Sequence, residues 1–124
     1  MPLAAVMANA GISTIGYDLD KHKIKDLNNN KLPFYEKDLL QIFINSKKNG
    51  YLKITNEFKF NAQYFIICVG AELIGKKVNI KNISNLISKL CNFLTTDSSI
   101  CIRGTMSVGD MRTIKKLIEK KTSF

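Results

Sequence analysis

The chain has 124 residues, 45% of them hydrophobic, which suits one globular domain with a single core. Its net charge of +9 raises nucleic acid as a partner, but the lysines are scattered and no aromatic side chain lies between them on a common face. No apolar run is long enough to span a bilayer. We therefore expect a solvated, lysine-rich surface, with no nucleic-acid partner and no membrane partner.

The three cysteines give no sign of a metal site. No two of the three cysteines, Cys68, Cys91 and Cys101, are close together in the sequence. No histidine stands at a metal-binding spacing from them. Cys68 and Cys101 lie in apolar runs, where a thiol packs as a small hydrophobe. The pattern favours a reducing, cytoplasmic setting. The opening MPLAAVMANA resembles a signal peptide, but it lacks the basic segment of one and continues straight into a strand.

The chain opens with a predicted helix and a predicted strand. Residues 2–10 favour a helix, because proline stands in its first turn, alanines follow, and Gly11 can end it. Residues 12–17 then alternate apolar and small side chains, as a short strand does, and the strand stops at Asp18.

A second helix is predicted directly after this strand. Asp20 can cap a helix at 20–27 whose inner face carries Ile24 and Leu27. The asparagine-rich run at 28–33 is a loop.

A third helix follows the loop. Glu36 and Asp38 place negative charge at its start, and residues 49–50 close it. Its predicted apolar face consists of Leu39, Leu40, Ile42 and Phe43. A short strand is expected at 52–55 and a helical turn within 56–63.

The second half alternates strands and helices. Residues 64–70 are continuously apolar, which indicates a strand covered on both faces. A polar loop reaches Asn79, which can cap a helix at 80–94, and residues 98–102 form the next strand. The apolar side of that helix consists of Ile83, Leu86, Ile87, Leu90 and Leu94.

The last predicted helix follows a loop at 104–109, and Asp110 is expected to cap it. Its apolar residues are Met111, Ile114, Leu117 and Ile118. Strands that alternate with helices in this way predict an α/β fold with a parallel sheet.

Asp18 is the first candidate for a binding residue. A carboxylate at the end of a Rossmann-type strand accepts hydrogen bonds from both ribose hydroxyls and repels a 2′-phosphate, which favours NAD over NADP. An aspartate after a strand can also be an ordinary helix cap, and Asp18 by itself leaves both interpretations open.

Six short motifs stand in order along the chain: MPLA at 1–4, GYDLDKHK at 16–23, LN at 27–28 with PFYE at 33–36, GYLKIT at 50–55, ICVGAE at 67–72 and GTMSVGDM at 104–111. This ordered set resembles the NAD-binding N-terminal domain of the UDP-glucose/GDP-mannose (nucleotide-sugar) dehydrogenases over almost the whole chain. The family pattern reads G-x-P-L-A, G-x-D-x-D-x-x-K, L-N-x-G-x-x-P-x-x-E, G-x-L-x-x-T, I-C-V-G-T-P and S-T-V-P-x-G-T-T.

The resemblance implies a Rossmann-like parallel sheet with helices on both faces. Residues 1–124 would be a partial NAD-binding domain, truncated at both ends, that lacks the first strand and the Gly-rich loop. In the Rossmann strand order 3-2-1-4-5-6, that first strand lies between the strands expected at 12–17 and 64–70. Its absence would leave two unpaired strand edges inside the sheet.

The resemblance also implies an enzyme and its cofactor. The whole protein would be an NAD-dependent, homo-oligomeric dehydrogenase that oxidises the sugar C6 alcohol of a UDP- or GDP-sugar to a carboxylate. Matched residue by residue, Asp18 would hold the adenosine ribose, Lys23 would lie over the adenosine side, and Thr105 would hydrogen-bond near the nicotinamide. The catalytic residues of the family belong to its other domains, so none is assigned here, and this chain alone is expected to be inactive.

Several positions depart from the family pattern. Ala71 stands in place of threonine and Glu72 in place of proline, while 106–107 and 110–111 also differ. The alternative is a non-catalytic, basic Rossmann-like module that binds nucleic acid or a protein. Such a module would respond to oligonucleotide in a salt-sensitive way and would not respond to NAD.

Overall fold

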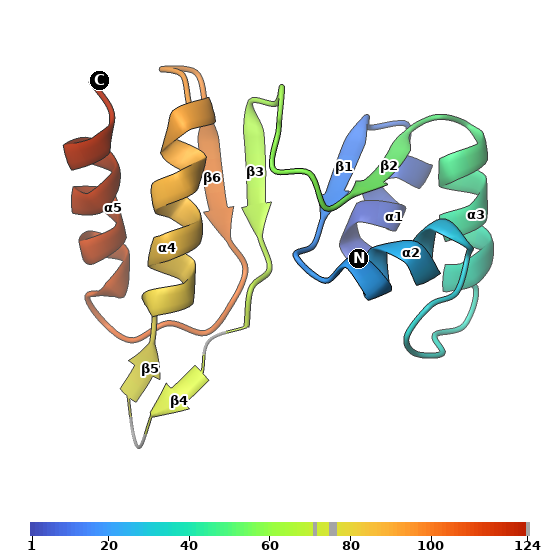
Figure 1. The fold of residues 1–124 in the computed structure, drawn as a ribbon, viewed down its shortest axis with the longest axis horizontal. Helices are drawn as coiled ribbons and strands as arrows, with labels where there is room; N and C mark the ends of the chain where they lie inside the picture. Colours follow the sequence, from blue (N-terminus) through green and yellow to red (C-terminus); the bar gives the residue numbers. More distant parts are fainter. Residues whose placement is uncertain (71, 75–76, 124) are drawn as a thin grey trace. The chain divides into compact units, whose positions relative to one another are not determined.

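The computed structural model describes residues 1–70, 72–74 and 77–123. The elements follow in the order α1 (Pro2–Asn9), β1 (Thr14–Tyr17), α2 (Lys21–Asn28), α3 (Leu39–Lys48), β2 (Leu52–Thr55), β3 (Tyr64–Ile67), β4 (Glu72–Ile74), β5 (Lys77–Asn79), α4 (Lys81–Leu90), a 3₁₀ turn (Cys91–Phe93), β6 (Ser99–Ile102) and α5 (Asp110–Lys121) (Figure 1). They form two compact units, Met1–Phe58 and Lys59–Phe124.

The strands form parallel pairs, which confirms the predicted α/β class. β1 runs parallel to β2 with Thr14 opposite Leu52, and β3 runs parallel to β6 with Tyr64 opposite Ser99. Among the described residues these are separate two-stranded sheets. A third pair, the antiparallel β4 and β5, lies in the stretch that was predicted to be loop up to Asn79.

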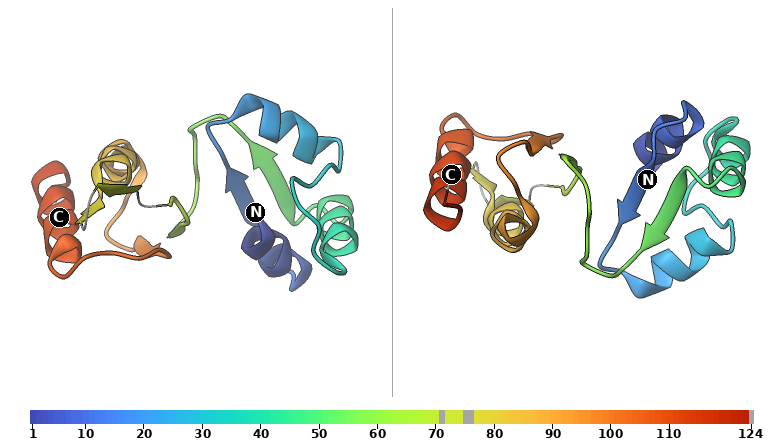
Figure 2. Two further views of the ribbon diagram at one scale, coloured as in Figure 1. Left: turned by 90° about the horizontal axis from the view of Figure 1, so that it is seen from below. Right: turned by 90° about the horizontal axis from the view of Figure 1, so that it is seen from above.

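The first unit has helices on both faces of its sheet. Figure 2 shows α2 on one face of the β1–β2 pair, with α1 and α3 on the other. The apolar side chains of these elements form one buried cluster that consists of Ala5, Ala8, Ile24, Leu27, Leu39, Phe43, Leu52 and Ile54. Burying an aliphatic or aromatic side chain contributes about 1.5–3 kcal/mol. The burial of this cluster therefore stabilises the β1–β2 pair, whose carboxyl end carries the candidate site.

α1 and α3 approach each other closely because the residues between them are small. Ser46 of α3 is 1% exposed. Its hydroxyl lies 3.0 Å from the Ala5 carbonyl oxygen of α1 and 2.7 Å from the Ile42 oxygen in its own helix. The single hydroxyl proton is shared between these two carbonyl oxygens, so the buried polar atom is satisfied, and the contact with Ala5 joins the two helices.

In the second unit, only one face of the strands is buried. Along β3, Tyr64 and Ile66 are 75% and 40% exposed, whereas Ile67 is 5% exposed. The prediction that this strand is covered on both faces is therefore wrong. Successive side chains of a strand point to opposite faces, and only one of these faces contributes to the buried core. The buried residues of this unit are Ile67, Ile83, Ile87, Leu90, Cys91 and Ile114.

The cysteines also differ in their exposure. Cys91 is buried, while Cys68 and Cys101 are exposed. The expectation that Cys68 and Cys101 pack as small hydrophobes is therefore wrong. Both continue the exposed side of the alternation along β3 and β6, so their thiols are not part of the core.

The predicted helical turn at residues 56–63 is also wrong, because these residues contain no helix. The ring of Phe58 meets Tyr17 edge-to-face at 5.1 Å within the first unit. Phe60 makes similar contacts with Phe65 and Phe93 in the second unit, at 6.3 and 5.7 Å. Aromatic pairs at such separations add to the stability gained from burial. They hold this segment in a conformation that its local sequence does not indicate.

The helices agree with the predictions except at some ends and surface positions. α3 begins at Leu39, after Asp38, whose φ of 63° is left-handed and whose side chain makes no capping hydrogen bond. Glu36 precedes the helix. Leu40 and Met111, which were counted among the apolar residues of their helices, are 46% and 53% exposed. The prediction that Asp110 caps α5 is wrong, because Gly109 is the N-cap residue and Asp110 is the first residue of the helix. The α-helix predicted for 80–94 ends at Leu90 and continues as the 3₁₀ turn.

Within the described ranges, no helix has both the length and the apolar character needed to cross a membrane.

Candidate functional site

Asp18 lies at the carboxyl end of β1, directly after the last residue of the strand. Its N–H donates to the Thr55 carbonyl at 3.3 Å, which extends the β1–β2 ladder by one step. Parallel α/β sheets bind ligands at this end of their strands. The backbone therefore places the Asp18 carboxylate where a ligand of this fold would arrive.

The Asp18 carboxylate forms an ion pair with Lys23, whose side chain belongs to the first turn of α2. Lys23 Nζ contacts Oδ2, and Oδ1 accepts the Asp20 N–H at 3.2 Å. The Asp18 side chain is 26% exposed and that of Lys23 is 39% exposed. A carboxylate has about four acceptor positions, so these two contacts leave capacity for the hydroxyls of a ribose.

Asp20, rather than Asp18, caps helix α2. Oδ1 of Asp20 accepts the N–H groups of His22 and Lys23 at 2.9 and 3.1 Å. This confirms the predicted cap and fixes the turn from which the Lys23 side chain extends. The Asp18 carboxylate accepts from Asp20 itself, ahead of the first turn of the helix.

Replacing Asp20 with alanine is expected to lower the stability of α2 by about 0.5–2 kcal/mol, because two N–H groups at the helix start lose their acceptor. Hydrogen exchange of the α2 amides measures this loss. Asp26→Ala, which removes the same charge from an exposed position of α2, is the control. An equal effect of both changes would show that charge matters here and capping does not.

The pKa of the Asp18 carboxyl is lower than its ordinary value. Partial burial raises this pKa, but hydrogen bonds from Lys23 and the Asp20 N–H, together with the positive charges of Lys23 and the N-terminal amine, lower it further than burial raises it. The carboxylate is therefore ionised at neutral pH and is an acceptor only.

Replacing Lys23 with methionine is expected to raise the pKa of Asp18, because the strongest group that favours the ionised form is lost. A depressed carboxyl pKa contributes stability above its ordinary value of about 3.9, and this contribution disappears as the pH falls through the folded-state pKa. A carbon-detected NMR titration of Asp18 in both proteins measures the change. Identical titration curves would contradict the role given to Lys23.

The far end of α2 is held by Lys47 of α3. Its ammonium donates to the carbonyl oxygens of Leu27 and Asn28, at 3.2 and 2.7 Å, and to Asn30 Oδ1 at 3.0 Å. It also lies 5.4 Å from the centre of the Phe43 ring. Burial lowers the pKa of Lys47. Sequence reasoning missed this residue, because no local pattern links a lysine to carbonyls that lie so far away along the chain.

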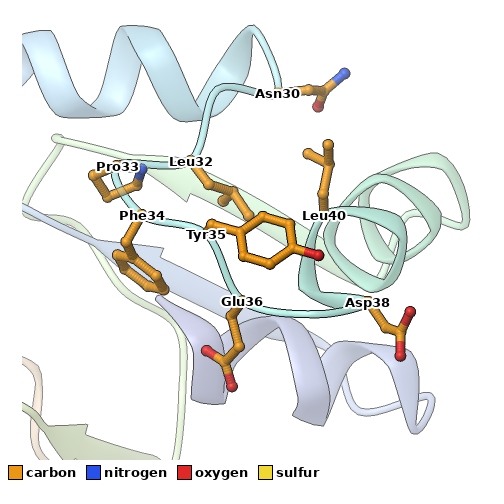
Figure 3. Close-up of a pocket in the computed structure, with 8 residues that line it drawn as sticks. All are labelled: Asn30, Leu32, Pro33, Phe34, Tyr35, Glu36, Asp38 and Leu40. Atoms are coloured by element: carbon orange, nitrogen blue, oxygen red, sulfur yellow. The ribbon is translucent and has the colours of Figure 1, made fainter.

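Two surface hollows adjoin these residues. The larger, of about 430 Å³, lies in the loop between α2 and α3, where Figure 3 shows the Tyr35 ring beside Leu40. Its lining consists of Asn30, Leu32, Pro33, Phe34, Tyr35, Glu36, Asp38 and Leu40. The smaller, of about 290 Å³, is lined by Asp20, His22, Lys23, Asp26, Lys31, Leu32 and Pro33. Only the smaller hollow includes Lys23, so it is the one next to Asp18.

Thr105 belongs to the second unit, in the exposed loop between β6 and α5. The loop ends in a local turn, in which Asp110 Oδ2 accepts the Ser107 N–H at 2.7 Å. The structure thus brings two of the three predicted site residues, Asp18 and Lys23, into contact, whereas Thr105 lies in the other unit. Ala71 and the side chain of Glu72 lie outside the residues that the structure describes.

The residues around Asp18 can bind and orient a ligand. Across the described parts of the chain, no three histidine, cysteine, aspartate or glutamate side chains are grouped to hold a metal ion. The site offers one ionised carboxylate, one ammonium and the end of a parallel strand pair. A carboxylate accepts hydrogen bonds, and an ammonium donates them.

Comparison with known proteins places the chain among nucleotide-sugar dehydrogenases. Residues 1–124 match the UDP-glucose/GDP-mannose dehydrogenase family, NAD binding domain. The UDP-N-acetyl-D-mannosamine dehydrogenase of Methanocaldococcus jannaschii is 27% identical over 97% of this chain and 29% of its own length. The corresponding enzyme of Pyrococcus horikoshii is 23% identical over 100% of this chain and 30% of its own length.

Solved structures show the same fold. The UDP-D-ManNAc dehydrogenase from Pyrococcus horikoshii superimposes with a TM-score of 0.91 and 24% identity, over 99% of this chain and 30% of that one. A GDP-mannose dehydrogenase from Pseudomonas aeruginosa gives a TM-score of 0.88 and 22% identity over the same shares. The chain thus spans about 30% of the length of the relatives that it resembles. Because the family match extends over all 124 residues, the chain belongs to the UDP-glucose/GDP-mannose dehydrogenase family and corresponds to its NAD-binding domain.

Proposed function

We propose that residues 1–124 serve as a partial NAD-binding Rossmann domain of a nucleotide-sugar dehydrogenase. The full-length protein would be a homo-oligomer that oxidises the sugar C6 alcohol of a UDP- or GDP-sugar to a carboxylate. The observation that carries this proposal is the ionised Asp18 carboxylate, held by Lys23 at the carboxyl end of β1. The names of the relatives, which are UDP-N-acetyl-D-mannosamine and GDP-mannose dehydrogenases, support the class of substrate.

Each proposed residue has a binding role. Asp18 accepts hydrogen bonds from the adenosine ribose hydroxyls, and its charge disfavours a 2′-phosphate. Lys23 keeps Asp18 ionised and lies on the adenosine side, and Thr105 donates a hydroxyl near the nicotinamide. When bound, NAD supplies the hydride acceptor, and the domain supplies its orientation. The groups that act on the sugar come from other parts of the protein, so this chain alone is inactive.

The test is a comparison of cofactors with the full-length protein. Titration calorimetry is expected to show binding of NAD and weaker binding of NADP. Formation of NADH, followed by its absorbance, should then be measured with UDP-sugars and with GDP-sugars. Failure to bind NAD would overturn the proposal, and a salt-sensitive response to oligonucleotide alone would favour a nucleic-acid-binding module.

A further inference from the structure

The positive charge of the chain is concentrated in its second unit. Residues 59–124 contain 11 of the 19 lysines and arginines and 4 of the 10 acidic residues, so this unit carries +7 of the net charge of +9. The expectation that nucleic acid is not a partner depended on lysines that are scattered along the sequence. The folded chain shows which of these cations share a face.

Three of the cations form a line along helix α5. Arg112, Lys116 and Lys120 are four residues apart, which places them on one face, about 6 Å from one another along the axis at a rise of about 1.5 Å per residue. All three are exposed. Ile114, on the opposite side of the helix, is 2% exposed. α5 lies beside α4 in this unit (Figure 1). The row of three cations, the basic stripe, is therefore turned away from the core.

The charges of the basic stripe are not compensated within the described parts of the chain, where none of its three cations is in an ion pair. Glu119 lies next to the stripe, but its carboxylate pairs with Lys115, whose Nζ is 3.7 Å from Oε1. Like charges four residues apart on a helix repel each other. An anion bound along the stripe would relieve this repulsion.

The chemistry of this face fits a nucleic-acid backbone better than a protein or a membrane. The core of a protein interface is poor in charged residues, whereas the exposed residues between the stripe positions are Thr113, Lys115 and Glu119. A helix that binds a membrane inserts its apolar side, but the apolar side of α5 is turned to the core. Phosphates follow one another about every 3.4 Å along one strand of a duplex, so a stripe about 12 Å long spans three to four of them.

We propose that the basic stripe binds the sugar-phosphate backbone of nucleic acid without sequence specificity. Lysine and arginine attract phosphates by charge and release the counterions of the nucleic acid. α5 contains no aromatic residue that could stack on a base, so the contact is with the backbone. The stripe and Asp18 belong to different units, and this inference goes beyond the proposed function and does not depend on it.

The experiment measures binding of the full-length protein to two labelled probes, a DNA duplex and a single-stranded RNA, by fluorescence anisotropy at several salt concentrations. Each phosphate contact that is lost should reduce the slope of log K against log[salt] by about 0.9 for the duplex and about 0.7 for the single strand. Replacing the stripe by Arg112→Gln, Lys116→Gln and Lys120→Gln should therefore reduce the duplex slope by about 2.7 and weaken binding at about 50 mM salt by tenfold or more. Glutamine is close to lysine and arginine in helix propensity, so α5 should stay folded, and a melting curve checks this.

A matched triple variant puts the same change of charge in the first unit. Lys25→Gln, Lys48→Gln and Lys53→Gln replace three exposed lysines there. This variant should keep the slope of the unsubstituted protein. The single substitution Lys116→Gln, in the middle of the stripe, should reduce the duplex slope by about 0.9, and it decides the question if the triple stripe variant does not fold.

Three results would overturn the inference. The first is no binding of either probe at about 50 mM salt. The second is an equal loss of slope in the two triple variants, because binding would then follow the net charge and not the stripe. The third is an unchanged slope in Lys116→Gln. A failure of the unsubstituted protein to bind NAD would overturn the proposed function alone.

Discussion

Replacing Phe43 with alanine is expected to lower the stability of the Met1–Phe58 unit by about 3–5 kcal/mol, the cost of deleting a fully buried aromatic side chain. Phe43 is 1% exposed in the core cluster of this unit. Its ring also supports the ammonium of Lys47, which holds the end of α2. Native-state hydrogen exchange of the amides in α1, α2 and α3 reports the loss for this unit specifically.

Leu40→Ala is the matched control, because Leu40 lies on the same helix but is 46% exposed. A surface substitution of this kind is expected to change stability by no more than about 0.5 kcal/mol. Equal losses from the two substitutions would mean that the core of this unit is not where the structure places it.

In the full-length protein, replacing Asp18 with alanine is expected to weaken NAD binding by about tenfold or more. Each hydrogen bond from a ribose hydroxyl to a charged acceptor contributes about 1.5–3 kcal/mol, and a factor of ten corresponds to about 1.4 kcal/mol. The substitution also leaves the Lys23 ammonium without its carboxylate, which adds an unbalanced positive charge at the site. Titration calorimetry with NAD measures the effect.

Asp97→Ala is the control for this experiment. Asp97 is an exposed acid of the second unit, and its replacement changes the net charge by the same amount. NAD should bind to the Asp97→Ala variant nearly as it does to the unsubstituted protein. If Asp18→Ala also leaves the affinity unchanged, Asp18 does not hold the ribose.

Much of the fold could be predicted because its signals are local. The Asp20 cap, the stop at Gly11 and the strand Leu52–Thr55 each depend on a few adjacent residues, and the structure confirms them. Leu40 could not be placed from the sequence, because a helical period does not tell how wide the buried face of a helix is. The packing of Phe58 and Phe60 depends on partners distant in the chain, so the segment between β2 and β3 was wrongly assigned.

The candidate site also includes residues that could be predicted from the sequence and one that could not. Asp18 and Lys23 share one motif at the start of a helix, so their proximity follows from sequence alone. Lys47 supports the same helix from α3, through contacts that only the folded chain brings about. The role of Thr105 stays a prediction that follows from the family motif.

Because the three cysteines differ in exposure, a thiol-reactive reagent should label some of them and not others. A thiol-reactive dye should attach to Cys68 and Cys101, which are exposed. Cys91 should stay unlabelled in the folded chain, because it is 8% exposed and burial raises the pKa of its thiol, despite the nearby charge of Lys121. Labelling of Cys91 would then report opening of the second unit, and fluorophores on Cys68 and Cys101 would report what approaches the uncovered side of its strands.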